Sequence, residues 1–310
     1  MGDYAVSYTP RSLDRDPPNF LEKSKKKKTI IVFALFLAFI YFLYRSGFLE
    51  NLNVLNIGNK EAKKDKLIAD LQKIISSSGG TFSIYIYDIN AKEGFGINER
   101  MVIRGASLNK IPILASLYTM VNQGKIDLEK QIVIQKEDMQ DYGTGSIRYD
   151  KPGTLYSLKT LARLMMEKSD NTASHLLGKV IIGEDKVQEM INKWNLTQTD
   201  MAENKTSAYD LEIIMTKIYN GEITNQALSA EMLDFMYQTD FEDRITLGVP
   251  KEIKVYHKTG DEVGKIHDVA IVDLPGRPYY LAVLTTDMAD EKKTKEAIAK
   301  ISELVYAYMK

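Results

Sequence analysis

The chain has 310 residues, of which 44% are hydrophobic, and its 41 basic and 42 acidic residues leave it nearly neutral. This length is sufficient for one large domain or two small ones with a substantial core, and the charge balance gives no indication of a nucleic-acid partner. The chain contains no cysteine, which excludes disulfides, thiolate zinc sites and a cysteine nucleophile.

The first 62 residues divide into three segments. Residues 1–28 are polar, contain three prolines and lack periodic apolar residues, so we expect a disordered tail. Residues 29–45 contain the uncharged run TIIVFALFLAFIYFLY directly after four consecutive lysines, which predicts a transmembrane anchor in lipid. Bulky or charged residues follow the run where a signal-peptide cleavage site needs small ones, so an uncleaved anchor is favoured over a cleaved signal peptide. Residues 46–62 are expected to form a linker.

The charges that flank the apolar run predict its orientation. Five lysines lie between Leu21 and Thr29, whereas Arg45 is the only basic residue in the fifteen after Tyr44. By the positive-inside rule, the N-terminal tail should be cytoplasmic. The sequence therefore predicts a single-pass protein of the cell membrane whose C-terminal domain is extracellular or periplasmic.

Residues 63–310 should fold as one domain. A helical pattern runs from about Lys60 to Ser77, and alternation over Thr81–Asn90 predicts a strand followed by a second short strand near Gly96. From Ser107 to about Met236, apolar residues recur at three- and four-residue spacing, which predicts several helices. Strand patterns return over residues 251–260, 266–274 and 279–287, and a last helix is expected at about 290–308.

This order of elements indicates the architecture. Strands at both ends of the domain with helices between them predict one sheet built from N- and C-terminal segments. A helical subdomain, about residues 105–252, should be inserted between the two groups of strands.

Three short motifs occur in order along this domain. They are Ser107-Leu108-Asn109-Lys110, Ser169-Asp170-Asn171 and Lys258-Thr259-Gly260. The first pattern alone is weak, because the tail repeats it at Ser24 and Lys27. The three motifs together, in order and on suitable elements, predict a nucleophilic active site.

The spacing of Ser107 and Lys110 suits a nucleophile and its base. A serine at a helix N-terminus lies at the positive end of the helix dipole, and its backbone N–H is free to hold an oxyanion. A residue three positions later lies on the same helix face, so Lys110 can reach the Ser107 hydroxyl. Lysine acts as a base only when neutral, which requires burial and a neighbouring cation, for which Lys258 is the candidate.

Three further residues complete the predicted site. The N–H of Asp261, just after the third motif, is the candidate for a second oxyanion donor. Ser169 is placed to relay a proton to the leaving nitrogen, and Asn171 to orient an amide of the substrate.

The three motifs together are the signature of class A β-lactamases and penicillin-binding proteins, and residues 63–310 resemble that family. The resemblance extends to PGTLYSLKTLARLMMEKSDNTASHLL around the second motif and to the strands that follow the third. It implies an α/β (α+β) fold with an antiparallel sheet flanked by helices and an inserted all-helical subdomain. No cofactor or metal is implied. The implied residues are the acylated nucleophile Ser107, the base Lys110, the proton relay Ser169 and the substrate-binding Asn171, Lys258, Thr259 and Gly260.

Two more residues are candidates for substrate binding. Arg244 lies fourteen residues before Lys258, a spacing at which some class A enzymes have an arginine that reaches the same substrate carboxylate. A solvated arginine at a helix end is the alternative. Tyr142 is a candidate for the mouth of the cleft, with an ordinary loop tyrosine as the alternative.

One departure from the family affects the expected rate of hydrolysis. Class A enzymes have a glutamate in an ExxLN pattern that activates the deacylating water, and this pattern is absent between the second motif and Thr206. Glu203 is the nearest candidate, but it lies three residues before Thr206, so a surface glutamate is favoured. We therefore expect acylation, whereas the family's basis for fast hydrolysis is missing from this stretch of the sequence.

Other chemistries fit less well. Asn109 breaks the GxSxG pattern that Gly105 and Ser107 begin, which argues against a Ser-His-Asp hydrolase. His257 and His267 lie on predicted strands without the spacing of a metal site, so packing or hydrogen bonding at the edge of the site is expected. The GTGS segment after Tyr142 lacks the lysine of a phosphate loop and is expected to be a turn.

The sequence thus predicts a serine hydrolase of the class A β-lactamase type that opens β-lactam rings through an acyl-enzyme on Ser107. The alternatives are a carboxypeptidase or transpeptidase acting on D-alanyl peptides, and a β-lactam receptor that is acylated once. The protein is expected to be a monomer.

Overall fold

The computed structural model describes residues 32–37, 41 and 48–310. The predicted tail, residues 1–28, and most of the predicted anchor, residues 29–45, lie outside the described residues. Within the described ranges, no helix combines the length and the apolar character that crossing a membrane requires. Residues 63–310 form one compact unit.

The first long helix corrects one expectation. Helix α2 spans Phe48–Ser78 and therefore begins well before Lys60. Residues 48–62, expected to be part of a linker, are helical. Phe48, Leu52 and Leu55 recur at the three- and four-residue spacing of a helix, and no proline interrupts the segment. The helical pattern therefore begins earlier in the sequence than we expected.

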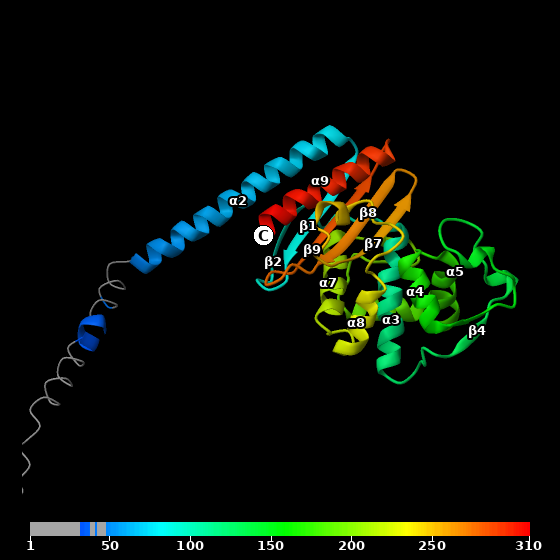
Figure 1. The fold of residues 1–310 in the computed structure, drawn as a ribbon. Coiled ribbons are helices and arrows are strands. Elements are labelled where there is room, and N and C mark those ends of the chain that lie inside the picture. Colours follow the sequence, from blue (N-terminus) through cyan, green and yellow to red (C-terminus); the bar gives the residue numbers. More distant parts are fainter. Residues whose placement is uncertain (1–31, 38–40, 42–47) are drawn as a thin grey trace, which may run out of the picture. The chain divides into compact units, whose positions relative to one another are not determined.

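Five strands form one antiparallel sheet in the order β2-β1-β9-β8-β7 (Figure 1). The strands are β1 (Thr81–Asp88), β2 (Glu93–Ile97), β7 (Val255–Glu262), β8 (Lys265–Val272) and β9 (Tyr279–Thr286). Strands from the two ends of the domain therefore pair in one sheet, since β1 lies beside β9. The predicted sheet is confirmed.

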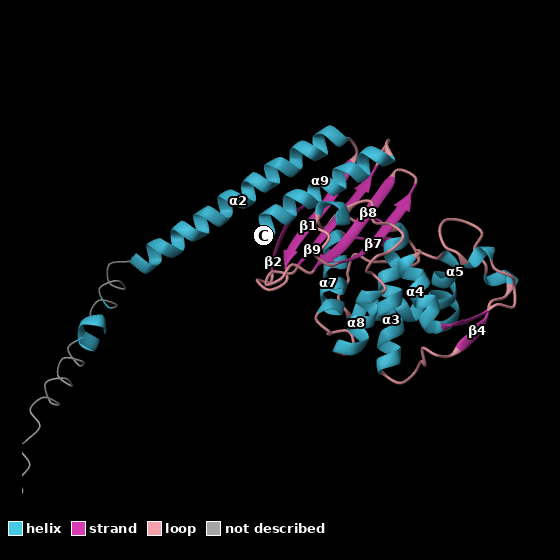
Figure 2. Cartoon of the chain, viewed as in Figure 1, coloured by secondary structure: helices cyan, strands magenta, loops and turns pink. Residues whose placement is uncertain are grey.

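Most of the chain between β2 and β7 is helical (Figure 2). The α-helices are α3 (Lys110–Asn122), α4 (Leu158–Glu167), α5 (Asn171–His175), α6 (Glu184–Lys193), α7 (Ala208–Tyr219) and α8 (Gln226–Asp234), and the C-terminal helix is α9 (Glu291–Met309). The inserted subdomain is not all-helical as expected. It also contains the pair β4 (Gln131–Val133) with β5 (Leu155–Ser157). Its strand β6 (Lys205–Thr206) pairs with β3 (Ile103–Arg104), which lies just before the subdomain. Strands of two or three residues are too short to show an alternating pattern.

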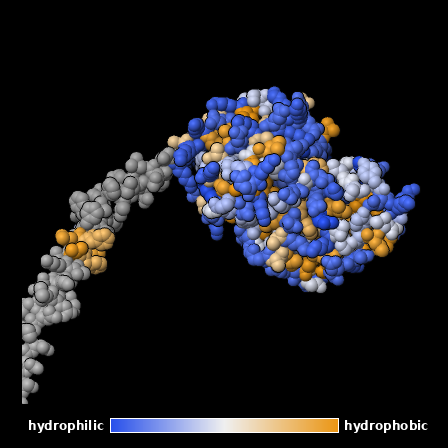
Figure 3. Space-filling view, viewed as in Figure 1, coloured by the Kyte–Doolittle hydropathy of each residue, from blue (hydrophilic) through white to orange (hydrophobic). Residues whose placement is uncertain are grey.

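The sheet is apolar on both faces because helices cover each of them. Successive side chains of a strand point to opposite faces. Val283 of β9 belongs to a buried cluster with Leu71 of α2 and Ile301 of α9, whereas its neighbour Ala282 belongs to a second cluster with Ile214 of α7. Figure 3 shows the complementary pattern, with hydrophilic residues over most of the displayed surface of the domain. Strand β7 remains at the sheet edge beside the helical subdomain, where the predicted motifs meet.

Candidate active site

A cavity of about 630 Å³ lies where β7 meets the helical subdomain. Five of the predicted site residues line it: Ser107, Lys110, Tyr142, Asn171 and Asp261. Ser169, Lys258 and Thr259 are almost fully buried. Segments that are far apart in the sequence thus converge at one site.

Ser107 lies in a tight helical turn that leads directly into α3. The turn is a 3₁₀-helix, Ala106–Asn109, and α3 begins at Lys110. Leu108 anchors the turn because its side chain is fully buried. Ser107 therefore precedes the α-helix by three residues instead of opening it, and the Nζ of Lys110 lies 3.0 Å from its Oγ.

Lys110 is buried among more acceptors than an ammonium group has protons. Its Nζ lies 2.6 Å from the backbone oxygen and 3.1 Å from the Oγ of Ser169, and 2.8 Å from the Oδ1 of Asn171, in addition to the Ser107 contact. Burial, and next the charge of Lys258, lower the pKa of Lys110 well below its ordinary value. Once neutral, Lys110 keeps two N–H groups for its two shortest contacts and has a lone pair with which it can accept the hydroxyl hydrogen of Ser107.

Ser169 connects the two lysines of the site. Its Oγ lies 3.1 Å from the Nζ of Lys110 and 3.0 Å from the Nζ of Lys258. Ser169 has a φ of 51°, in the left-handed region, which costs about 1–3 kcal/mol for a residue with a side chain. Burial lowers the pKa of Lys258 to about 7, so this cation exchanges its proton near neutral pH.

The GTGS segment, residues 143–146, was expected to be only a turn, but it also holds the second motif in place. Asp170 is fully buried, and its Oδ2 accepts hydrogen bonds from the N–H groups of Ser146 and Ile147 at 2.6 and 2.9 Å. Gly145 passes so close that a Cβ there would lie 2.4 Å from this carboxylate. The two glycines in GTGS were the only sign in the sequence that this segment packs closely against another part of the chain. The fold shows that its partner is Asp170.

We expect Gly145→Ala to lower the free energy of unfolding by about 3–4 kcal/mol, because it combines a positive φ of 119° with a clash against a buried carboxylate. Gly153 is the matched control, since its φ is 97° and a Cβ there would meet nothing within 4 Å. Gly153→Ala should cost about 1–2 kcal/mol. Urea denaturation of both variants measures the difference, and equal losses would show that Gly145 matters only for its backbone conformation.

Gly260 allows β7 to lie directly against the Ser107 turn. A Cβ at this position would lie 2.9 Å from the backbone oxygen of Gly105 and 3.3 Å from the backbone nitrogen of Ser107. Its neighbour Asp261 lines the cavity. This close approach suits an oxyanion site made by the N–H groups of Ser107 and Asp261, which stays a prediction.

The two strand histidines are buried and serve hydrogen bonding. The N–H of Thr285 donates to the Nδ1 of His267 at 3.1 Å, so the proton of this imidazole is on Nε2, which donates to the Arg104 carbonyl. Burial lowers the pKa of His267 to about 4. For His257, burial opposes the charged form, but Asp268 and Glu242 outweigh it and raise the pKa to about 9. Among the described residues, no group of three or more His, Asp and Glu is arranged to hold a metal ion.

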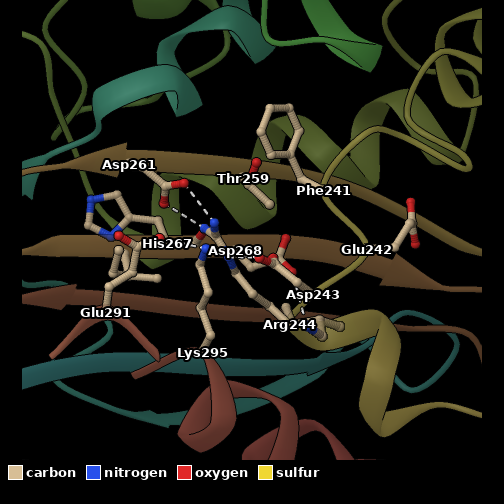
Figure 4. Close-up of polar contacts among 12 residues, drawn as sticks. Phe241, Glu242, Asp243, Arg244, Thr259, Asp261, His267, Asp268, Glu291 and Lys295 are labelled. Carbon is tan, nitrogen blue, oxygen red and sulfur yellow. Dashed lines mark hydrogen bonds and ion pairs between the residues drawn. The ribbon is translucent and has the colours of Figure 1, made fainter. Parts of the chain in front are cut away.

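The structure contradicts one of the two expectations for Arg244 and leaves substrate binding by it a prediction. It is fully buried, which excludes a solvated side chain, and it does not line the cavity. Its Nη1 and Nη2 donate to the Oδ1 and Oδ2 of Asp261 at 2.7 and 2.6 Å, and Nη1 also donates to the His267 carbonyl (Figure 4). A protein carboxylate thus occupies the fork that was expected to bind a substrate carboxylate, because Asp261 follows the third motif on the adjacent strand.

Tyr142 lies at the rim of the cavity, with 63% of its surface exposed. Its backbone oxygen accepts a hydrogen bond of 3.1 Å from the Nδ2 of Asn171. The Oδ1 of the same amide accepts from Lys110, so both ends of the Asn171 side chain are fixed.

Comparisons with known proteins agree with this geometry. Residues 66–309 match the β-lactamase enzyme family. The β-lactamase VEB-1 of Pseudomonas aeruginosa is 24% identical over 267 residues, which cover 77% of this chain and 88% of VEB-1. The structure of PBP-A superposes with a TM-score of 0.73 at 27% identity, covering 78% of this chain and 95% of that one. The class A β-lactamase of the last common ancestor of Gram-negative bacteria also has a TM-score of 0.73, at 23% identity, and the match covers 78% of this chain and 98% of that one. This chain therefore belongs to the β-lactamase enzyme family and has the fold of its class A members.

Proposed function

We propose that the protein is a serine hydrolase that opens β-lactam rings through an acyl-enzyme on Ser107. The observation that carries the proposal is the contact of 3.0 Å between Ser107 Oγ and the Nζ of Lys110, a buried lysine with a lowered pKa. A serine hydroxyl is a weak nucleophile until a neighbouring base removes its proton.

Acylation follows from the contacts of the site. Neutral Lys110 takes the proton of Ser107 while the Oγ attacks the lactam carbonyl carbon, and the N–H groups of Ser107 and Asp261 stabilise the oxyanion. As the carbon–nitrogen bond breaks, Ser169 donates its hydroxyl proton to the leaving nitrogen. Ser169 regains a proton from Lys110, whose Nζ lies 3.1 Å away, so the relay ends with Lys110 neutral again.

Substrate binding uses four more of the predicted residues. Lys258 and Thr259 bind the carboxylate of the substrate, Asn171 orients its amide, and Tyr142 lies at the mouth of the cavity. Gly260 contributes by its small size, since it permits the close approach of β7 to Ser107.

Hydrolysis of the acyl-enzyme should be slower than its formation. Among the described residues that line the cavity, three have carboxylates, Glu184, Asp261 and Glu262. Glu184 pairs with Lys179, Asp261 with Arg244, and Glu262 with Arg104. Among the described contacts, none of these carboxylates is hydrogen-bonded to Ser107 or Lys110, so none of them is placed to activate the deacylating water.

The test is the reaction of the full-length chain, in detergent, with a chromogenic cephalosporin. We expect a burst of about one equivalent, followed by slower steady turnover. A burst without any turnover would favour the second candidate, a penicillin-binding-protein-like peptidase or a receptor acylated once, which the lack of a nearby water-activating carboxylate supports. Release of D-alanine from a D-alanyl peptide would then identify the peptidase. The absence of both burst and covalent adduct would refute β-lactam acylation.

Glu203→Gln should leave the deacylation rate within about twofold of the wild-type rate, because the side chain lies on the surface and away from the reacting atoms. The side chain of Glu203 is 65% exposed, lies 3.6 Å from Lys205 and does not line the cavity, although its neighbours Ala202 and Asn204 do. Steady-state turnover after the burst measures this rate. A hundredfold loss would identify Glu203 as the missing water activator.

We further propose that residues 29–45 anchor the protein in the cell membrane with the tail inside. The uncharged run and the preceding lysines support this proposal. Protease added to intact cells should remove the domain and spare the tail. Digestion of the tail alone would require the opposite orientation.

A further inference from the structure

The contact between Arg244 and Asp261 is a complete bidentate ion pair beside the cavity. Two parallel N–H···O bonds of 2.7 and 2.6 Å join the guanidinium to both carboxylate oxygens. Figure 4 shows the two side chains pointing toward each other from neighbouring segments, with Asp243 and Lys295 close to the same guanidinium. This is the geometry in which arginine binds carboxylates most strongly.

Asp261 differs from the other acidic residues around Arg244 in its position. Asp268 is fully buried, and Asp243 bonds the Nε of Arg244 outside the cavity lining. Asp261 lines the cavity, and its side chain remains 40% exposed. A substrate anion that approached Arg244 from the cavity would therefore meet the Asp261 carboxylate first.

The energetic balance favours the internal pair. The guanidinium is fully buried, so its charge needs a counter-ion in every state of the protein. A carboxylate held on the same chain has no association entropy to lose, whereas a substrate carboxylate does. An incoming anion would also be repelled by the Asp261 carboxylate.

We propose that the Asp261 carboxylate determines substrate specificity by occupying the fork of Arg244 and withholding it from the carboxylate of a β-lactam. The inference rests on the proposed acylation of Ser107. A substrate carboxylate must then rely on Lys258 and Thr259. Esterification of the β-lactam carboxylate then weakens only the contacts with Lys258 and Thr259, whereas in an enzyme that presented a free guanidinium it would remove a bidentate contact as well.

The experiment compares acylation of Ser107 by one chromogenic cephalosporin and by its methyl ester. The measured quantity is the ratio of the second-order acylation constants, free acid over ester, at pH 8, where Lys258 is mostly neutral because burial lowers its pKa to about 7. Both compounds use the same oxyanion donors, so changes in the oxyanion site cancel in this ratio. The wild type should give a ratio within about threefold of unity.

Removing the Asp261 carboxylate should restore discrimination between the free acid and the ester. In Asp261→Ser, the fork of Arg244 loses both carboxylate oxygens and becomes available to the free acid, so the ratio should rise about tenfold. Glu262→Gln is the control, because it removes a charge from the same wall without contacting Arg244, and it should change the ratio by less than about threefold. Adding Arg244→Lys to Asp261→Ser keeps the positive charge but removes the fork, and should cancel the gain.

The possible outcomes separate the inference from the proposed function. A ratio unchanged by Asp261→Ser, or a wild-type ratio of ten or more that Arg244→Lys lowers, would overturn the inference while Ser107 acylation stands. If Asp261→Ser does not fold, the isosteric Asp261→Asn and the wild-type ratio still decide the question. Failure of both compounds to label Ser107 would overturn the proposed function and this inference together.

Discussion

A chain with alanine in place of Ser107 should take up no β-lactam and should show no burst, a loss of about 10⁶-fold in the acylation rate. The Oγ of Ser107 is the only atom of that side chain able to form the ester bond. The described contacts show no other hydroxyl hydrogen-bonded to Lys110 except that of Ser169. Intact-protein mass spectrometry after incubation with a cephalosporin measures the covalent adduct directly.

The matched control for this variant is Ser24→Ala. Ser24 and Lys27 repeat the spacing of Ser107 and Lys110 in the N-terminal tail. Its replacement should leave both the adduct and the burst unchanged. An adduct that persists in Ser107→Ala would place the nucleophile elsewhere, with Ser169 the first residue to examine because of its contact with Lys110.

The sheet could be predicted because its strands have strong patterns of apolar residues. Strands β1, β8 and β9 each have eight residues with near-continuous burial, and all three were expected within two or three residues of their observed ends. The pairs β3 with β6 and β4 with β5 were missed, since strands this short depend on tertiary contacts more than on local pattern.

Residue spacing predicted the contact between Ser107 and Lys110 but not the contacts that hold the rest of the site in place. Three positions along one helical segment suffice to bring Lys110 to Ser107, which is a local relation. The partner of Arg244 is Asp261, seventeen residues later, and the partner of Gly145 is Asp170, so neither contact follows from a local period. These long-range contacts of the site could therefore not be predicted from the sequence, and only the fold revealed them.

The buried charges of the site depend on one another. Lys258 lowers the pKa of Lys110 through its positive charge, while Asp261 and Asp268 act to raise the pKa of Lys258 against the effect of burial. Ser169 Oγ lies within 3.1 Å of both lysine Nζ atoms. Changing Asp261 should therefore also affect the base indirectly, which is why the specificity test relies on a ratio of two substrates.

Replacing Lys110 by alanine should slow acylation by about 10³-fold, within the range that general base catalysis contributes. The variant keeps Ser107 but leaves its hydroxyl without a proton acceptor. Wild-type acylation should rise with pH as Lys110 loses its proton. This rise should occur well below the ordinary lysine range, because burial and Lys258 lower the pKa of Lys110. The burst rate in a stopped-flow spectrometer, recorded between pH 5 and 9, measures both effects, and the rise should be absent in Lys110→Ala.

Lys110→Arg distinguishes a base from a mere positive charge. Arginine keeps the charge and a similar length, but its guanidinium stays protonated and has no lone pair to accept the Ser107 proton. We therefore expect this variant to be as slow as Lys110→Ala. If Lys110→Arg acylates at the wild-type rate, Lys110 acts only by its charge. The proton of Ser107 must then leave by another route, such as a water held by Asn171, whose Oδ1 lies 2.8 Å from the lysine nitrogen that the variant removes.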